Sequence, residues 1–276
     1  MSDKYLKGRA ALVTGGASGM GRAMALAFAD AGADVAIGSL LAGGGKVSGE
    51  LVNMPGAEEL EATKAEIEAR GARAVAVSLD VTAPESVQAF YDAAVEAFGK
   101  VDILGNAAGI TAEHAIVDHD DRLWQKVLDV NLTGTYRTIK LCLPGMIERK
   151  WGRIINIAST AASVGAVTSA AYCASKAGVV GLSRCAALEG APHGVTCNAI
   201  SPTWVETTFG KEWMSNIAEE QESRSGDEYI AEVKAANPQG RLVQPEEIGA
   251  LAAFLCRDEA LGITMQDLTV SAGSLW

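Results

Sequence analysis

The stretch TGGASGMG, residues 14–21, decides how the rest of this chain is interpreted. It follows a short apolar run and precedes a helical pattern rich in apolar residues. Its glycines Gly15, Gly19 and Gly21 permit a tight turn and let backbone N–H groups approach a phosphate at the positive end of a helix. A glycine-rich turn between a strand and a helix predicts a dinucleotide-binding segment.

Beyond this turn, apolar strand-like runs alternate with longer helical patterns, which indicates βαβ units and a parallel sheet. No linker or repeat divides the chain. We predict an α/β fold with one doubly wound domain over residues 1–276 and helices on both faces of a seven-stranded parallel sheet. A long polar helical segment at 203–237 is predicted to be a lid. Strands are expected at 9–15, 34–39, 73–81, 101–109, 152–159, 194–202 and 268–273.

The composition limits the classes of partner. The 276 residues carry a formal net charge of −11, and nucleic-acid binding is disfavoured because it needs a basic face. No apolar run reaches the roughly 20 residues that span a bilayer and no signal peptide opens the chain, so we expect no membrane partner and a cytoplasmic location. The five cysteines form no C-x-x-C pair and are expected to be reduced.

A second motif, STAASVGAVTSAAYCASKAG at 159–178, carries the strongest chemical signal. Ser159 ends a strand, and Tyr172 and Lys176 are four residues apart, which places both side chains on one face of a helix. A tyrosine with a pKa of about 10 is a poor acid or base near neutral pH. We expect the lysine ammonium to lower the pKa of Tyr172 toward the working range.

Taken in order along the chain, these motifs resemble those of the classical short-chain dehydrogenase/reductase family. Further matches are LDV at 79–81, NAAG at 106–109, VNLTG at 130–134 and NAISPTWVETT at 198–208. The part from residue 237 onward is similar to the tail of 3-hydroxybutyrate dehydrogenases and related alcohol dehydrogenases. The resemblance implies a Rossmann fold, a homotetramer, and reversible hydride transfer between a nicotinamide and a ketone or secondary alcohol.

The resemblance also implies a role for each matched residue. Tyr172 would exchange a proton with the substrate oxygen, and Ser159 would hydrogen-bond that oxygen. Lys176 would bind the nicotinamide ribose, Asn131 would position a water next to that lysine, and Asp80 would hold the adenine amine. The residues expected to bind the cofactor are Gly15, Ser18, Gly19, Met20, Gly21, Ser39, Asp80, Val81, Asn106, Ala107, Gly109, Tyr172, Lys176, Pro202, Val205 and Thr207.

The sequence says less about the substrate. No histidine follows Ser159 closely, unlike in hydroxybutyrate dehydrogenases, so a bulky or aromatic uncharged ketone or alcohol is favoured. Three alternatives stay open: a 3-oxoacyl (carrier-protein) reductase, which the acidic lid disfavours; a 3-hydroxy acid dehydrogenase; and a non-catalytic nicotinamide-binding regulator, which the intact Tyr172 and Lys176 disfavour. The residues predicted to line the substrate pocket are Ser159, Thr160, Trp204, Trp213 and Met214, the last three with lid packing as the alternative.

Residues 38–57, GSLLAGGGKVSGELVNMPGA, depart from the family pattern. The lysine is not followed by serine or threonine, so the segment is not a P-loop. Ser39 stands where an NAD site offers a carboxylate and where arginine often marks an NADP site. We expect NAD, with NADP open. Residues 40–57 are interpreted as an insertion over the adenosine end, in which backbone groups or Lys46 replace the missing side chain, or else as a disordered surface loop.

Two histidines lie in segments that suggest other sites. In VDHDDRLW at 117–124, His119 lies among three aspartates. Such aspartates are better explained as a helix N-cap and as partners of the helix dipole, so no metal site is predicted. His114, shortly after NAAG, either faces the substrate or occupies a plain loop position.

Overall fold

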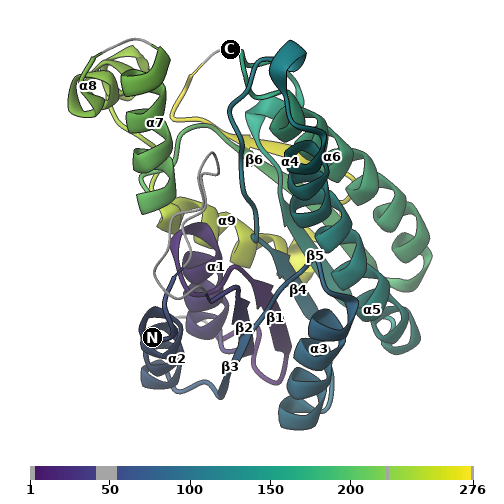
Figure 1. Ribbon diagram of the computed structural model, residues 1–276. Coiled ribbons are helices and arrows are strands. Elements are labelled where there is room, and N and C mark those ends of the chain that lie inside the picture. Colours follow the sequence, from purple (N-terminus) through teal and green to yellow (C-terminus); the bar gives the residue numbers. More distant parts are fainter. Residues whose placement is uncertain (1–3, 42–54, 222–223, 275–276) are drawn as a thin grey trace.

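Seven parallel strands form one sheet at the centre of the molecule (Figure 1). The strands are β1 (Ala10–Thr14), β2 (Asp34–Ser39), β3 (Ala74–Ser78), β4 (Ile103–Asn106), β5 (Gly152–Ile157), β6 (Val195–Pro202) and β7 (Asp267–Val270). Their order is β3-β2-β1-β4-β5-β6-β7, and every neighbouring pair is parallel. The computed structural model describes residues 4–41, 55–221 and 224–274. The predicted doubly wound fold is confirmed.

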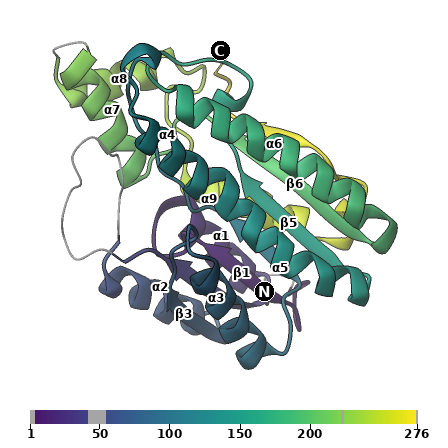
Figure 2. The ribbon, with the colours of Figure 1, turned by 45° about the vertical axis from the view of Figure 1, so that its right-hand side comes forward.

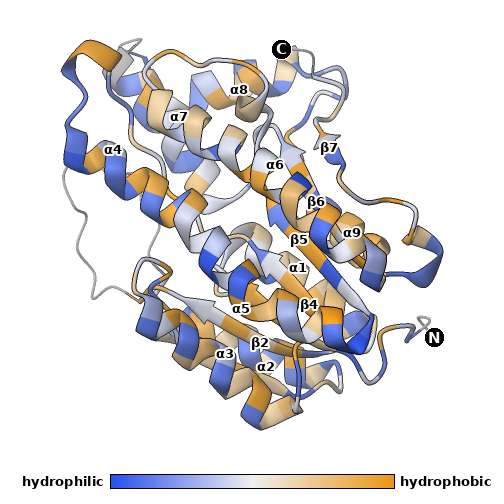
Figure 3. Cartoon of the chain, turned by 90° about the vertical axis from the view of Figure 1, so that its right-hand side faces the viewer, coloured by the Kyte–Doolittle hydropathy of each residue, from blue (hydrophilic) through white to orange (hydrophobic). Residues whose placement is uncertain are grey.

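Helices cover both faces of this sheet (Figure 2). They are α1 (Gly19–Asp30), α2 (Ala57–Ala69), α3 (Pro84–Phe98), α4 (Asp121–Leu128), α5 (Gly134–Arg149), α6 (Ala170–Gly190), α7 (Thr208–Gln221), α8 (Gly226–Ala236) and α9 (Pro245–Leu255). Strand side chains alternate between the faces. Val13 therefore packs in the core formed with α1 and α9, whereas Leu12 packs in the core formed with α3 and α5. The outer helices α2, α3 and α4 mix hydrophilic and hydrophobic residues along their length (Figure 3).

The strand order changes direction between β1 and β4, where Thr14 pairs with Asn106. At such a switch point the connections after the two strands leave to opposite faces, and a crevice opens at their carboxyl ends. The Thr14 hydroxyl accepts hydrogen bonds from the backbone N–H groups of Ala107 and Ala108, both at 3.1 Å. These bonds hold the segment after β4 beside the glycine turn and fix the shape of the crevice.

A buried polar chain holds β4 and β5 together beneath this crevice. Asn106 donates from Nδ2 to Asn156 Oδ1 at 2.8 Å, and its own Oδ1 accepts from the Thr138 hydroxyl at 2.7 Å. Asn156 in turn donates to Ser183 Oγ at 2.8 Å. Because buried polar groups are costly unless paired, this network fixes the strand pair against α5 and α6.

The segment predicted to be a lid forms the helices α7 and α8, which stand apart from the helices around the sheet (Figure 1). Glu206 anchors them. Its carboxylate lies 3.2 Å from the ammonium nitrogens of both Lys211 on α7 and Lys234 on α8, and it accepts from Gln244 Nε2 at 2.8 Å. The helical character of 203–237 is confirmed, and its motion as a lid stays a prediction.

The insertion expected at 40–57 is described only at its two ends, by Leu40 after β2 and Pro55 before α2. Its middle, including Lys46, lies outside the described residues, so the role assigned to that lysine stays a prediction. None of the helices in the described part of the chain is long and apolar enough to cross a membrane.

Candidate active site

The glycine turn after β1 forms a cradle for an anion. Gly15 and Gly19 adopt left-handed backbone angles, with φ of +69° and +51°, which L side chains rarely adopt. A Cβ at Gly21 would lie 2.2 Å from the carbonyl oxygen of Gly15, so no larger residue fits. Ser18 caps α1 without a side-chain hydrogen bond, and the first turn holds no acidic residue. The N–H groups at this helix end suit the pyrophosphate of a dinucleotide.

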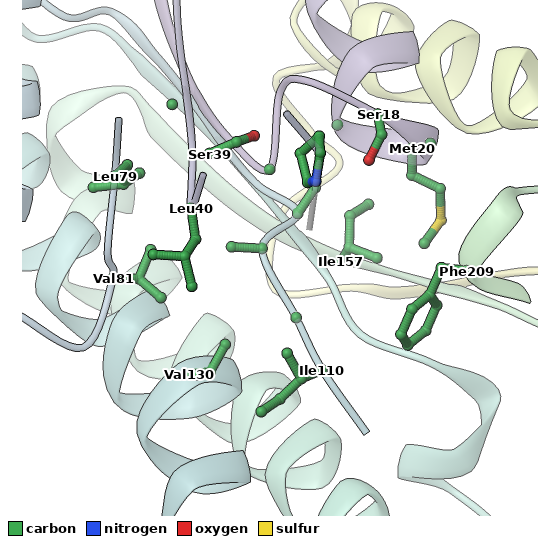
Figure 4. A pocket seen from close by; sticks show the side chains of 18 of the residues that line it. Ser18, Met20, Ser39, Leu40, Leu79, Val81, Ile110, Val130, Ile157 and Phe209 are labelled. Carbon is green, nitrogen blue, oxygen red and sulfur yellow. The ribbon is translucent and has the colours of Figure 1, made fainter. Parts of the chain in front are cut away.

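A groove of about 180 Å³ continues from this cradle along the carboxyl ends of the strands. In Figure 4, Ser39, Leu40 and Val81 gather at one end, and Met20 and Phe209 lie at the other. The end that carries Ser39, Leu40 and Val81 is largely apolar and suits an adenine ring. Thirteen of the residues predicted to bind the cofactor line the groove: Gly15, Ser18, Gly19, Met20, Gly21, Ser39, Asp80, Val81, Ala107, Gly109, Tyr172, Lys176 and Thr207.

Three residues predicted to bind the cofactor do not line this groove. Asn106 is 4% exposed and belongs to the polar chain beneath it. Pro202 ends β6 and Val205 follows it, two strands beyond the switch point, and both line a neighbouring cavity instead. Their contact with a cofactor stays a prediction, since the position of β6 in the sheet places its end at the second cavity.

The two side chains expected at the adenosine end make local hydrogen bonds. Ser39 is buried, and its hydroxyl accepts from the backbone N–H of Ala17 at 3.0 Å, so it supports the cradle. Asp80 accepts from the N–H of Thr82 at 2.8 Å and from its hydroxyl at 2.6 Å. Asp80 is thus a turn cap that also lines the groove.

The predicted catalytic side chains meet where the groove joins the second cavity. Lys176 donates from Nζ to the carbonyl oxygen of Ile157 at 2.8 Å, and Nζ lies 5.6 Å from the centre of the Tyr172 ring. Tyr172 hydrogen-bonds Ser159 and lines both spaces. One helix, α6, therefore presents the phenol and the ammonium together, as their four-residue spacing predicts.

Asn131 lies beside this group in a π-helical turn, Asp129–Thr133, between α4 and α5. Its side chain accepts from the N–H of Ile110 at 2.8 Å and donates to the Ile110 carbonyl and to Ser175 Oγ, both at 2.9 Å. A Cβ on Gly109 would lie 3.3 Å from Asn131 Oδ1 and 3.5 Å from Lys176 Nζ. Asn131 and Lys176 therefore both lie next to Gly109, and the bridging water between them stays a prediction.

The second cavity has a volume of about 430 Å³ and lies between β6, α6 and α7. Ser159, Thr160, Trp204 and Trp213 line it. These are four of the five residues predicted for the substrate pocket, and substrate binding in this cavity stays a prediction. Met214 does not line it: this residue is fully buried, whereas its neighbour Trp213 is at the cavity wall. Successive residues of a helix point about 100° apart, so the prediction for Met214 was wrong.

Comparison with known proteins agrees with this geometry. A family model described as enoyl-(acyl carrier protein) reductase matches residues 15–274. The chain is 35% identical to the 3-oxoacyl-(acyl-carrier-protein) reductase FabG of Vibrio cholerae over 97% of this chain and 98% of that protein. It is 37% identical to the D-beta-hydroxybutyrate dehydrogenase of Cupriavidus necator, over 92% and 93%. A variant of actinorhodin polyketide ketoreductase crystallised with NADPH aligns with a TM-score of 0.87, 36% identity and 96% of each chain.

The chain belongs to the classical short-chain dehydrogenase/reductase family. As a member of that family, the protein is an NAD(P)-dependent oxidoreductase that interconverts CH–OH and ketone groups. A regulator without catalysis is therefore not the function of this chain.

The electrostatics of this dehydrogenase/reductase site differ from one expectation. Burial raises the pKa of Tyr172 to about 12, against the lowering effect of its hydrogen bond to Ser159. Burial also lowers the pKa of Lys176 to about 8. The expectation that Lys176 lowers the pKa of Tyr172 was wrong for this state of the protein, because desolvation disfavours the charged form of both groups. At neutral pH the phenol is protonated and the amine is mostly charged.

Sequence reasoning missed the one residue with a formal charge among the described residues that line the cavity. Glu113, in the segment after β4, lines the second cavity, whereas its neighbour His114, considered from the sequence, makes a backbone bridge to Ser169. The only signal was an acidic residue four positions after NAAG, and nothing local gives its direction. The metal-like cluster behaves as expected: Asp120 caps α4 by accepting from the N–H groups of Arg122 and Leu123.

Proposed function

We propose that the protein reduces bulky, apolar ketones, including aromatic ones, to secondary alcohols. The observation that carries this proposal is the aromatic wall of the second cavity. Trp213 packs edge-on against Trp204 with 4.9 Å between centroids, and Phe209 lies 5.9 Å away. Aromatic surfaces of this kind bind apolar rings by area and by edge-to-face contacts. A cavity of about 430 Å³ also falls in the range of pockets for small organic molecules.

The proton chemistry follows from the side chains that border the cavity. Tyr172 holds its proton at neutral pH, since burial raises its pKa to about 12, and it can donate that proton to a carbonyl oxygen. Ser159 hydrogen-bonds the phenol and can stabilise charge on the same oxygen. Lys176, held by the Ile157 carbonyl, keeps a positive charge beside the groove. A nicotinamide bound in the groove would supply the hydride.

Two unpaired groups add polar contacts for the substrate. The indole N–H of Trp213 and the hydroxyl of Thr203 are buried and have no hydrogen-bond partner among the described residues. Both residues line the second cavity. They support a substrate that carries an acceptor beside its ring, since unpaired buried polar groups are costly until a ligand pairs them.

A second candidate is the reduction of 3-oxoacyl groups, because the relatives include a 3-oxoacyl-(acyl-carrier-protein) reductase and a polyketide ketoreductase. An exposed apolar residue in the cavity lining supports this second candidate. Val167 lines the cavity and is 85% exposed, so an acyl chain could pass it. Because another relative is a D-beta-hydroxybutyrate dehydrogenase, small hydroxy acids and oxo acids are also included in the test.

We also propose that the groove accepts both NADH and NADPH. Ser39 supplies neither the carboxylate that repels a 2′-phosphate nor the arginine that binds one. The ketoreductase relative crystallised with NADPH supports use of the phosphorylated form. The preference for NAD expected from the sequence is therefore replaced by use of both. A cytoplasmic location and a homotetramer stay predictions.

The test is a panel of ketones assayed with each reduced cofactor. We expect aryl ketones to have higher kcat/KM values than acetone, acetoacetate or 3-oxoacyl thioesters. A higher kcat/KM for the thioesters would replace the first candidate with the second. A higher kcat/KM for acetoacetate than for the aryl ketones would instead support a 3-hydroxy acid dehydrogenase.

A further inference from the structure

Glu113 brings a carboxylate into the substrate cavity. Of the described residues that line this cavity, it is the one that carries a formal charge. It lies in the segment between β4 and α4, and the adjacent residue His114 donates its backbone N–H to the carbonyl of Thr168 at 2.8 Å. The segment before α6 is thus held against the segment that carries Glu113.

Three hydroxyl groups fix the direction of this carboxylate. Ser169 Oγ lies 2.9 Å from both carboxylate oxygens, Thr168 Oγ1 donates to Oε2 at 2.7 Å, and Thr111 Oγ1 donates to Oε1 at 3.2 Å. Thr111 and Ser169 are themselves almost fully buried, with exposed fractions of 0% and 3%. Buried hydroxyls that converge on one carboxylate preorganise it as a binding group.

Thr168 holds its position at a cost in backbone energy. Its φ is +63°, in the left-handed region, where a β-branched residue is a strong outlier. Strain of this kind persists only where the surroundings enforce it, and it is concentrated at binding and catalytic sites. Here the surroundings include the hydrogen bond from Thr168 to Glu113.

The carboxylate of Glu113 can accept more hydrogen bonds than the three hydroxyl groups donate. Each hydroxyl carries one hydrogen, so Thr111, Thr168 and Ser169 supply at most three. A carboxylate has about four lone-pair sites, which leaves one open. No ion pair involves Glu113 within the described part of the chain, so its charge is uncompensated as well. Its open acceptor site and its charge both suit a donor group on a ligand.

The carboxylate also lies close to the proposed proton donor. Ser169 precedes Tyr172 by three residues, so the two are neighbours on the first turn of α6. Burial is the main cause of the raised pKa of Tyr172, and the charge of Glu113 adds to it in the same direction. Glu113, Ser169 and Tyr172 all line the second cavity, so a substrate whose carbonyl reaches Tyr172 shares that cavity with the carboxylate.

We infer that Glu113 is a specificity-determining residue, which selects ketones bearing a hydrogen-bond donor, above all a protonated amine, and rejects carboxylates. This inference rests on the proposed function, because it takes the second cavity as the substrate site. It extends that function by naming the chemistry of the substrate away from the reacting carbon. It also argues against small oxo acids, because an unpaired carboxylate repels a second one.

A purely structural role is the competing explanation, in which Glu113 only clamps the two segments together. Glu113→Gln separates the two explanations, because glutamine keeps the shape and one acceptor while it removes the charge. A structural clamp would lose stability in this variant and leave charge discrimination unchanged. Glu219→Gln, at an exposed position on α7 that does not line the cavity, is the matched control.

Three aryl ketones with one skeleton test the inference: para-methylacetophenone, para-aminomethylacetophenone and para-acetylbenzoate. For the native protein we expect kcat/KM for the ammonium ketone to exceed that for the carboxylate ketone by about tenfold or more. In Glu113→Gln this ratio should fall at least about fivefold, with a change under about threefold for the neutral ketone. Glu219→Gln should keep the native ratio. Equal ratios in the native protein and Glu113→Gln would overturn the inference.

Failure of the proposed function would look different, since none of the three ketones would then be turned over. The dissociation constants of the three corresponding alcohols, measured by tryptophan fluorescence, give the same ratio without turnover. If Glu113→Gln does not fold, the salt dependence of the native protein decides. The ammonium-to-carboxylate ratio should fall as ionic strength rises from 0.01 to about 0.5 M, because salt screens charges. A ratio independent of salt and near one contradicts the role of Glu113.

Discussion

Trp213 meets Tyr172 edge-on, with 5.0 Å between the ring centroids and 74° between the ring planes. The indole belongs to α7 and the phenol to α6, so the predicted lid contacts the proposed proton donor directly. The same indole also packs edge-on against Trp204. One side chain thus lines the proposed substrate cavity and also packs against the proposed proton donor.

Trp213 and its neighbour Met214 should respond differently to truncation. Trp213→Ala should raise KM for an aryl ketone about tenfold, since it removes edge-to-face contacts worth about 0.5–1.5 kcal/mol besides apolar area. Met214→Ala should leave KM unchanged but lower the free energy of unfolding by about 2–5 kcal/mol, because Met214 is fully buried. Steady-state kinetics and denaturant unfolding of both variants check this. Similar KM values for the two variants would contradict the assigned cavity wall.

Tyr172→Phe should lose nearly all turnover. The substitution removes the hydroxyl that hydrogen-bonds Ser159 and keeps the ring that packs against Trp213. General acid catalysis contributes about 10²–10⁴-fold, so kcat should fall by at least about a hundredfold. The dissociation constant of the reduced cofactor should stay nearly constant. Turnover retained within about tenfold, a barrier change of only about 1.4 kcal/mol, rules out Tyr172 as the proton donor.

Lys176 should set the alkaline limit of activity. Its pKa is lowered to about 8 by burial, so it is charged below that pH and neutral above it. Tyr172, with a pKa of about 12, keeps its proton across this range. The value of kcat/KM for the reduced cofactor should therefore fall above about pH 8. In Lys176→Arg, which keeps the charge at high pH, the fall should move above about pH 10. An unchanged break in the arginine variant would assign it to another group.

The two reduced cofactors should be used with similar efficiency. No carboxylate or arginine occupies the position of Ser39, and its hydroxyl is engaged by Ala17. We expect kcat/KM values for NADH and NADPH to agree within about tenfold. If the native protein prefers NADPH by more than about a hundredfold and Lys46→Ala loses this preference, then Lys46 in the insertion determines cofactor specificity. A preference that persists in that variant would be incompatible with a neutral adenosine end.

Glu206 should make the anchoring of the lid depend on pH. Hydrogen bonds from Gln244, Lys234 and Lys211 lower its pKa to about 2 from an ordinary 4.5. A carboxyl with a lowered pKa stabilises the fold above its unfolded pKa, and the stabilisation is lost as pH falls from about 4.5 toward 2. Glu206→Gln should lower Tm at pH 7 by a few degrees. The difference from the native protein should shrink between pH 5 and 3, and a constant difference would argue against this anchor.

Much of the fold could be predicted because its signals are local. The glycines of the turn after β1 fix its backbone, and the apolar runs mark buried parallel strands whatever surrounds them. The four-residue spacing of Tyr172 and Lys176 fixes their common helix face. The residues of the cavity wall were harder to predict, because Trp213 and Met214 are neighbours in sequence and both are apolar. Only the packing of α7 decides that Trp213 lines the cavity and that Met214 is buried.

The sequence by itself determined the doubly wound fold, the cradle of Gly15, Gly19 and Gly21, and the order of the side chains predicted to be catalytic. Tertiary structure alone decided the pKa of Tyr172, because desolvation depends on what surrounds the phenol rather than on its neighbours in sequence. It also brought Glu113 beside Ser169, 56 residues away along the chain, and so placed a charge in the substrate cavity. Spacing along the chain sets local geometry, whereas burial and long-range partners set the charge state and direction of a side chain.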